Sequence, residues 1–459
     1  MNHRAKRPDM NRFNDMLHSF ELYLQDPEDN HLHASDIAYL LKKIRSKESK
    51  EEFLKLLVRI PSDVLGDVLL ELPEKVKDEA LEALSTEELA RAIEDLESDD
   101  ATDLIQDIDD LDVDKSEAVV AHLDEEDRED IDKLRRYEEN QAGAWMQTEL
   151  FDARLEESVQ ESVDRLRSLK EQGELENIYQ IFLVDDNQRL LAGISLEDLI
   201  VMDFKRCFKD ILAEDEYHFL SVEATEDIED VAKMFEQYDL SVLPVLDWQG
   251  KLVGRITADD IYDVMEEKAT EQIYNLAGVD DEAEQEEKLF GVFKKRASWL
   301  GVNLITAIIA SIVIGLFDQT LAAFIPLAIL MPIVASMGGN AGTQTLTVMV
   351  RQMALGDIDT ENAKEAVKKE FLVALFNGLL FSVVIGFIAY FWFNIELLGF
   401  VIALAMIFNL LVAGVFGALI PLLLKRLDID PAVGSTVLLT TLTDVFGFLS
   451  FLGLASLIL

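Results

Sequence analysis

The stretch KKRASWLGVNLITAIIASIVIGL (294–316) marks the boundary between two halves of opposite character. Charged residues crowd the sequence before Ala297, whereas only six Lys or Arg and ten Asp or Glu follow it. Of the formal net charge of −47, −43 therefore lies on residues 1–296 and −4 on the remainder. This partition predicts a strongly acidic soluble half followed by a lipid-embedded half.

Five largely uncharged stretches follow Ala297, and about 20 helical residues are enough to cross the hydrocarbon of a bilayer. The second is longer than a plain span needs, and it contains Pro326, Pro332 and the loop-like MGGNAG (337–342), so we expect its helix to be kinked or broken there. The expected spans are 299–316, 320–350, 371–393, 397–424 and 431–459.

Basic residues indicate the orientation of these spans. Lys294, Lys295 and Arg296 precede the first span, and the other Lys and Arg residues of this half fall in the connections 351–370 and 425–430. Both connections lie inside if the N-terminus is cytoplasmic, which satisfies the positive-inside rule. The start MNHRAKRPDMNRF lacks the apolar run of a secretory signal peptide. We expect a cytoplasmic N-terminus and a C-terminus outside.

Residues 1–135 form the first expected domain, an acidic helical repeat. Between 50 and 135, helix-breaking or capping residues recur every 12 to 14 positions, at Pro61, Pro73, Ser85, Ser98 and Asp112. Asp99 and Asp103 would share a helix face, which is unfavourable for like charges without a cation. Such an acidic excess disfavours nucleic acid as a partner and favours hard divalent cations, although a merely solvated surface also explains it.

Residues 136–256 form the second expected domain. Between Trp145 and Glu267 two segments repeat with a period of 62, IFLVDDNQRLLAGISLEDLI (181–200) and LPVLDWQGKLVGRITADDIY (243–262). Each predicts a strand, a turn, a strand and a helix capped by Ser195 or Thr257. The pattern resembles a tandem of cystathionine-β-synthase-type (CBS) domains. That family can hold an adenosine ribose, as in ATP, through residues matching Ser195 and Asp198. The same residues also cap helices in CBS pairs that bind nothing, so both interpretations stay open.

A helix is expected from Thr257 to about Leu276, followed by the acidic linker GVDDEAEQEEK (278–288). Residues 257–296 thus connect the soluble half to a transmembrane pore domain, 297–459. The fold class is a multidomain α-helical membrane protein: an α-superhelical N domain, an α/β tandem CBS domain and five transmembrane helices.

Asp444 is the only acidic or basic residue within the predicted spans. A carboxylate at that depth costs roughly 2.5 to 3.5 kcal/mol on insertion scales, so a water-filled cation path is a better environment than lipid. Thr440 and Thr441 add hydroxyl oxygens, and Mg²⁺ commonly keeps several waters while touching one or two carboxylates. The alternative is a protonated Asp444 bonded to the helix backbone.

The Gly-rich segment supplies Gly338, Gly339 and Asn340 as further candidate pore-lining residues, because irregular backbone at membrane depth is tolerated beside a cavity. The alternative is close helix packing through small residues. The single Cys207 excludes a cysteine-rich site, and no His, Cys or Ser constellation with catalytic spacing accompanies the acids, so no enzyme is expected.

The order of these parts resembles the MgtE family of magnesium channels across nearly the whole chain. The motifs are RYEENQAGAWM (136–146), MGGNAGTQ (337–344) and DPAVGSTVLLTTLTD (430–444). The resemblance implies that Asp444 binds hydrated Mg²⁺ in the pore. It also implies that Asp430 bridges through Mg²⁺ to the connecting "plug" helix. A homodimer in a bacterial-type inner (plasma) membrane is implied as well.

The resemblance further implies cytoplasmic Mg²⁺ sites that close the channel, and this sequence departs from the family both at those sites and in the pore. Lys268 and Gln272 stand where relatives commonly carry acids, and Val437 replaces a frequent Pro. The expected function is Mg²⁺ uptake closed by cytoplasmic Mg²⁺. A membrane-anchored adenine-nucleotide sensor and a proton-coupled divalent-cation transporter are the alternatives. The implied closing sites use Asp99, Asp103, Asp239, Asp260, Asp263 and Glu271.

Overall fold

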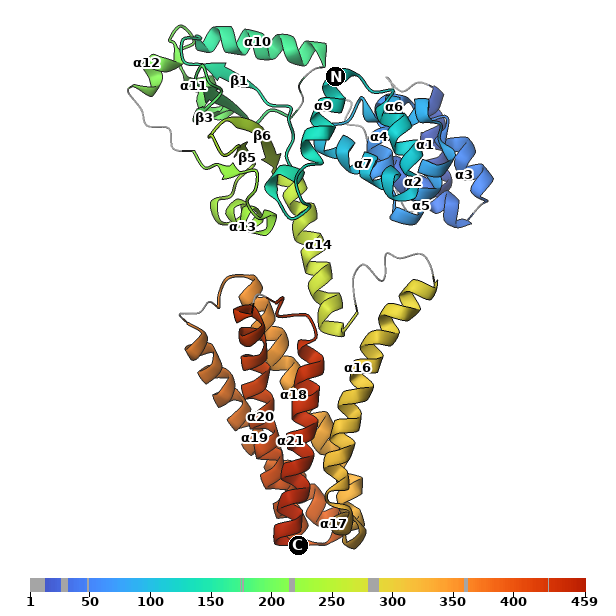
Figure 1. Cartoon of the computed structure of the whole chain (residues 1–459), viewed down its shortest axis with the longest axis vertical. Helices are drawn as coiled ribbons and strands as arrows, with labels where there is room; N and C mark the ends of the chain where they lie inside the picture. The colour runs from blue at the N-terminus through green and yellow to red at the C-terminus, as the bar shows by residue number, and fades with distance from the viewer. Residues whose placement is uncertain are drawn as a thin grey trace. The chain divides into compact units, whose positions relative to one another are not determined.

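The protein is described here by a computed structural model, which forms two compact units, Met1–Glu266 and Glu267–Leu459 (Figure 1). Most of the expected acidic linker, residues 280–288, lies outside the described residues. The structure describes residues 13–25, 32–47, 49–173, 175, 177–213, 219–279, 289–358, 362–427 and 429–459.

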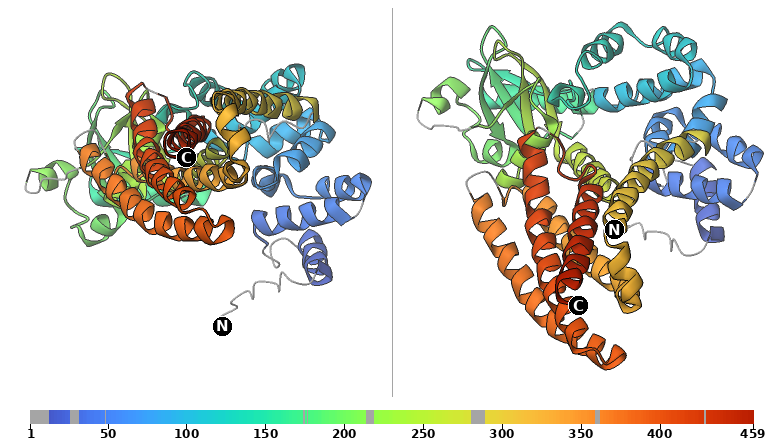
Figure 2. Two further views of the ribbon diagram at one scale, coloured as in Figure 1. Left: turned by 90° about the horizontal axis from the view of Figure 1, so that it is seen from below. Right: turned by 60° about the horizontal axis from the view of Figure 1, so that its bottom comes forward.

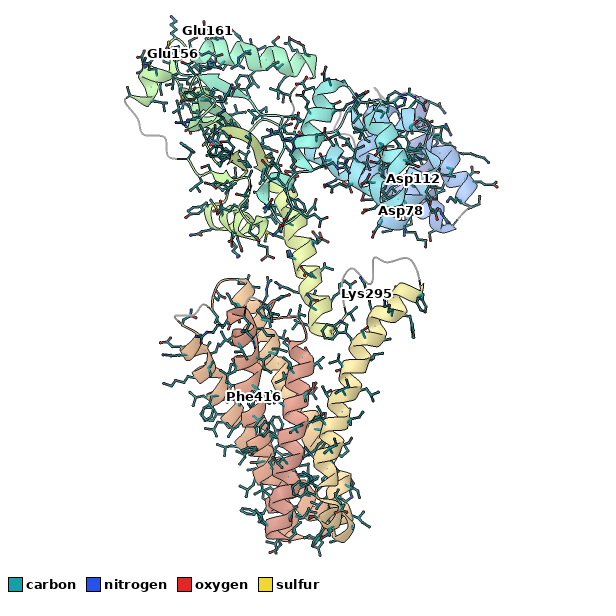
Figure 3. All side chains as sticks on the ribbon, in the orientation of Figure 1. Asp78, Asp112, Glu156, Glu161, Lys295 and Phe416 are labelled. Carbon is teal, nitrogen blue, oxygen red and sulfur yellow. The ribbon has the colours of Figure 1, made fainter. Side chains whose placement is uncertain are left out.

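The first unit begins with short helices that start where the sequence predicts. Helix α4 follows Pro61, α5 follows Pro73 and α6 follows Ser85. Asp112, labelled in Figure 3, caps α8 by accepting a hydrogen bond from Lys115 N at 3.2 Å. Such short helices are marginal alone, and each buries an apolar stripe in one common core. They are α1 (Phe13–Gln25), α2 (Ala34–Lys47), α3 (Lys50–Leu57), α4 (Ser62–Leu70), α5 (Glu74–Ala83), α6 (Thr86–Ile93), α7 (Ser98–Leu111), α8 (Val113–Val120) and α9 (Glu125–Leu134).

Two three-stranded sheets follow and confirm the predicted repeat. In each, the first strand is parallel to the second and the second antiparallel to the third. Ile181 pairs with Ile194 and Leu243 with Ile256, which are equivalent positions 62 residues apart. The strands are β1 (Asp152–Arg154), β2 (Gln180–Val184), β3 (Leu190–Ser195), β4 (Val222–Glu223), β5 (Val242–Leu246) and β6 (Leu252–Thr257). The helices are η1 (Ala142–Ala144), α10 (Val159–Gln172), α11 (Leu196–Val201), α12 (Phe208–Leu212) and α13 (Ile228–Tyr238).

The connecting helix α14 (Ala258–Ala277) confirms the helix expected from Thr257. In the second unit, α20 contacts α18, α19 and α21, and it runs beside α21 in Figure 2. Phe416 of α20, labelled in Figure 3, stacks on Phe446 of α21 with ring centroids 6.0 Å apart. Among the described residues, five helices are long and apolar enough to cross a membrane: α16, α18, α19, α20 and α21. The unit contains α16 (Leu289–Gly315), α17 (Asp318–Ala323), α18 (Ile325–Ala354), α19 (Ala363–Phe393), α20 (Glu396–Arg426) and α21 (Ser435–Ile458).

The predicted second span is broken before Pro326, where α17 ends at Ala323 and α18 begins at Ile325, but the expected break is wrong at Pro332 and MGGNAG, through which α18 is helical. Its glycines serve helix packing. A Cβ on Gly338 would overlap the Asn409 amide of α20, and one on Gly342 would lie 3.0 Å from Leu439 of α21. Close packing through small residues compensates for the poor helix propensity of glycine.

Candidate ion pathway and cation sensor

The start of α21 is shaped by Gly434. Its φ of +65° is left-handed, and a Cβ there would approach the Trp299 ring to 3.3 Å, so glycine suits both requirements. The helix that follows places Thr436, Thr440 and Asp444 at four-residue spacing, which puts them on one face.

Asp444 is half-buried in the single chain and makes no hydrogen bond or ion pair with any other residue that the structure describes. The hydroxyls near it donate within their own helix: Thr440 Oγ1 to Thr436 O at 3.0 Å, and Thr441 Oγ1 to Val437 O at 2.6 Å. Each hydroxyl oxygen still has lone pairs with which it can accept a hydrogen bond from an ion's water shell. This face therefore offers one carboxylate among hydroxyl oxygens.

Helix α18 carries an exposed polar face that the sequence analysis recognised only in part. Asn340 lies on this face, Gly339 has open space around it, and Gly338 is buried against α20. In the sequence, the helical spacing of these polar residues could have revealed this face. The expected break of the helix at MGGNAG concealed that spacing. The exposed polar residues are Ser336, Asn340, Thr343, Gln344 and Thr347.

A buried carboxylate lies just before the predicted third span. Helix α19 begins at Ala363, before the predicted start of the span at 371, and so includes Glu370. Glu370 is 8% exposed and accepts a hydrogen bond from Thr345 Oγ1 of α18 at 3.1 Å. Glu370 lies one residue before the predicted span 371–393, so Asp444 as the only charged residue within the spans stays a prediction.

The C-terminal end of α14 contacts the start of α21 directly. Asn275 Nδ2 donates to Asp430 Oδ2 at 3.2 Å, and Thr436 Oγ1 donates to Leu276 O at 2.7 Å. The second bond satisfies one of the carbonyls that every helix leaves unpaired at its C-terminus. Glu271, by contrast, pairs with Lys268 at 2.9 Å on the surface of the same helix.

Acids of α7 and α14 meet within the first unit. Burial, and then the carboxylate of Asp260, raises the pKa of Asp99 well above its usual range. The same two causes raise the pKa of Asp100 to about 7. Burial raises the pKa of Asp260 to about 6, although hydrogen bonds from Thr257 oppose this shift. These carboxylates are desolvated close to one another, so their ionised forms repel each other.

Two more predicted residues lie beside this group. Asp103 is one turn further along α7, and desolvation, followed by Asp107, raises its pKa to about 7. Asp263 lies one turn beyond Asp260, and burial, followed by Glu266, raises its pKa.

These paired acids fit a hydrated hard dication, which needs only one or two carboxylates. Within the described ranges, no group of three His, Cys, Asp or Glu side chains is assembled in a metal-holding arrangement. Asp239 is exposed at the C-cap of α13 with a φ of +51°, and no described contact joins it to the acids of α7 and α14. Within the first unit, the structure thus brings together Asp99, Asp103 and Asp260 but leaves Asp239 apart from them.

Ser195 and Asp198, the candidate nucleotide-binding residues, form hydrogen bonds with each other. Ser195 Oγ donates to Asp198 Oδ2 at 2.8 Å and accepts from Asp198 N at 3.1 Å. In the second CBS segment, Thr257 Oγ1 and Thr257 N both donate to Asp260 Oδ2, at 2.8 and 3.2 Å. This geometry is that of a capped helix, and a nucleotide role for Ser195 and Asp198 stays a prediction.

Three family models match the chain: MgtE, described as a divalent cation transporter, over residues 331–454; the MgtE intracellular N domain over 32–140; and the CBS domain over 209–267. They confirm the predicted fold class, with a helical N domain, a CBS pair and a multi-pass membrane part.

Individual proteins agree with the family models. The magnesium transporter MgtE of Thermus thermophilus is 35% identical over 339 residues, which are 73% of this chain and 74% of that protein. The magnesium transporter MgtE of Enterococcus faecalis is 35% identical over 332 residues, 72% of each chain. A crystal structure of the cytosolic domain of the Mg²⁺ channel MgtE in complex with ATP has 30% identity and a TM-score of 0.47, covering 54% of this chain and 98% of that one. The chain belongs to the MgtE family of magnesium transporters.

Proposed function

We propose that this chain is a channel for Mg²⁺ uptake, with its ion path along α21 and the polar face of α18. The observation that carries this proposal is the Asp444 carboxylate, which lies within a membrane span among hydroxyl oxygens and has no described protein partner. An uncompensated carboxylate at that depth is costly, and a hydrated dication compensates it. Relatives named magnesium transporters support the choice of ion.

The test is Mg²⁺ flux into proteoliposomes that contain the full chain. Asp444→Asn removes the charge at nearly constant volume, and we expect it to reduce flux at least about tenfold, equivalent to about 1.4 kcal/mol. Asp318→Asn is the matched control, because Asp318 lies exposed at the start of α17, between two spans. Full flux in Asp444→Asn would reject the proposed ion path.

We also propose that cytoplasmic Mg²⁺ closes the channel by bridging acids of α7 and α14. The contacts of Asn275 and Leu276 with the start of α21 support this, since α14 is one continuous helix from Ala258 to these residues. Each site that binds only the closed state adds about 1.4 kcal/mol at ten times its dissociation constant. A shift from 1:99 to 99:1 needs roughly 5.5 kcal/mol, so about four weak sites suffice.

Patch recordings with cytoplasmic Mg²⁺ test this gating. The double variant Asp260→Asn with Asp263→Asn should stay open at Mg²⁺ concentrations that close the wild type, because it lacks two bridging carboxylates. The matched control is Asp110→Asn with Asp114→Asn, which neutralises two exposed acids of the same domain away from α14. Equal inhibition of both double variants and the wild type would count against closure through α14.

The alternatives predict different recordings. A membrane-anchored adenine-nucleotide sensor carries no Mg²⁺ flux, whether or not ATP binds at Ser195 and Asp198. A proton-coupled transporter gives flux that follows an imposed pH gradient and shows no unitary currents. We propose unitary Mg²⁺ currents that persist without a pH gradient.

We further propose a homodimer with its N-terminal half in the cytoplasm. The basic residues around the spans support this orientation. The mass of the solubilised protein tests the dimer. Labelling of a cysteine introduced at Asp318 by an impermeant reagent tests the orientation, since that position should react from outside only.

A further inference from the structure

The side-chain amide of Asn409 lies in the core of the membrane helices. Asn409 belongs to α20, is fully buried, and donates from Nδ2 to Val334 O of α18 at 2.7 Å. Its buried Oδ1 has no hydrogen-bond partner among the residues that the structure describes. Nearby residues of the same helix, Met406 and Leu410, belong to an apolar core that α20 shares with α18 and α21. In such a core a partly unpaired amide lowers stability relative to an apolar side chain of the same shape.

Both neighbouring helices carry a glycine where this amide projects. On α18 a Cβ at Gly338 would overlap Asn409 Nδ2, and on α21 a Cβ at Gly447 would lie 3.0 Å from Asn409 Oδ1. The amide therefore packs against two helices at once. Its hydrogen bond to Val334 O fixes one register of α18 against α20, whereas purely apolar helix faces can pack in several registers.

The two helices that the amide contacts carry the proposed ion path. Gly447 lies three residues after Asp444 on α21, and Gly338 lies two residues before Asn340 on α18. Asn340 is on the exposed polar face of α18, whereas Gly338 is buried against α20. Because Asn409 is fully buried, it can place these polar side chains but does not itself line the path.

We propose that Asn409 is a positioning residue that fixes the separation of α18 and α21 beside Asp444 and so favours Mg²⁺ over the larger Ca²⁺. This inference rests on the proposed ion path along these two helices. Selectivity between the two ions depends on the size and flexibility of a site, because Mg²⁺ is smaller and keeps its waters, whereas Ca²⁺ accepts a variable number of oxygen ligands. A fixed helix separation therefore suits Mg²⁺, and a looser one admits Ca²⁺.

Asn409→Leu tests this role, because leucine is close to asparagine in size but bonds to no carbonyl. Fluxes of Ca²⁺ and of Mg²⁺ are measured into proteoliposomes that contain the full chain. We expect the ratio of Ca²⁺ flux to Mg²⁺ flux to rise at least about fivefold, equivalent to about 1 kcal/mol. The thermal unfolding midpoint should not fall, since leucine leaves no buried acceptor unpaired. A residue with only a structural role would instead give a lower midpoint with an unchanged flux ratio.

Ser382→Ala is the matched control. Ser382 is a buried polar residue of α19, and its hydroxyl donates to Leu379 O within its own helix. This variant should keep the wild-type flux ratio. An unchanged ratio in Asn409→Leu, or an equal rise in Ser382→Ala, would overturn the positioning role of Asn409.

Gly447→Ala reaches the same amide from α21 and does not depend on how leucine packs. Its added Cβ would press on Asn409 Oδ1, so the flux ratio should rise, but not when Asn409→Ala has already removed the amide. Gly453→Ala on the same helix is the control, because a Cβ there meets only the Phe317 ring at 3.9 Å. A rise that is equal with and without the amide, or no rise at all, would count against the inference.

Failure of this inference and failure of the proposed function give different results. If Asp444→Asn keeps full Mg²⁺ flux, the ion path is wrong and the proposed function fails. If Asp444→Asn loses flux while Asn409→Leu keeps the wild-type flux ratio, the ion path stands and only positioning by Asn409 is rejected.

Discussion

At the scale of single residues, the neighbouring acids of α7 and α14 titrate above the usual range of carboxylates. The pKa of Asp100 is about 7 and that of Asp260 about 6, whereas ordinary aspartates titrate near 4. The docked arrangement therefore binds more protons and loses stability as the pH rises from about 4 to about 7, and the penalty is complete above that. The charged groups around Asp100 and Asp260 are Asp67, Glu97, Asp99, Asp103, Glu149, Arg255, Asp259 and Asp263.

Mg²⁺ binding should displace these protons. We expect proton release on Mg²⁺ binding at about pH 6.5 and almost none at about pH 8.5, where the carboxylates are already ionised. Calorimetric titrations in buffers of different ionisation enthalpy measure the number released. Asp100→Asn should lower it at the acidic pH, and the exposed Asp110→Asn should not. The same release at both pH values would contradict a site at these acids.

At the scale of elements, glycines set the distance between α18 and α20. A Cβ on Gly417 would lie 2.9 Å from the backbone oxygen of Gly342. Gly417→Leu should destabilise the helical bundle by roughly 1 to 3 kcal/mol, the usual range for overpacking, and lower the thermal unfolding midpoint of the solubilised protein. Gly301→Leu on α16, where a Cβ meets nothing within 4 Å, should leave the midpoint unchanged.

The contact between α14 and α21 belongs to the same scale. Thr436→Val removes the hydrogen bond to Leu276 O at nearly constant volume, and a net loss of about 1 kcal/mol should raise the residual open probability at high Mg²⁺ about fivefold. Thr306→Val in α16 is the control, because Thr306 bonds only within its own helix. Recordings at saturating Mg²⁺ that show equal closure of both variants would exclude a role for this bond.

At the scale of the whole molecule, the −43 charge on residues 1–296 should make the soluble half depend on cations. Chelation of Mg²⁺ should increase amide hydrogen exchange in α7 and α14, because their acids then repel without a bridging ion, while β2 and β3 stay protected. Monovalent salt near 1 M should restore only part of the protection, since it screens charge but does not bridge carboxylates. Unchanged exchange in α7 after chelation would argue that the acids do not bind Mg²⁺.

The sequence alone predicted the features that depend on local patterns. The helix starts at Pro61, Pro73 and Ser85, the repeat of two strand–turn–strand–helix segments and the five apolar helices all follow from spacing, capping and hydropathy. The comparisons then confirmed the family that the motifs suggested. Such features are visible in a single sequence because neighbouring residues determine them.

Only the tertiary structure decided the features that join distant residues. Helix α18 continues through MGGNAG because Asn409, far along the chain, packs against Gly338. The buried Glu370 meets Thr345, 25 residues away, and Glu149 meets Ser98, 51 residues away. Local propensity says nothing about such pairs, because packing and hydrogen bonding between elements override the weak preferences of glycine and of single polar residues.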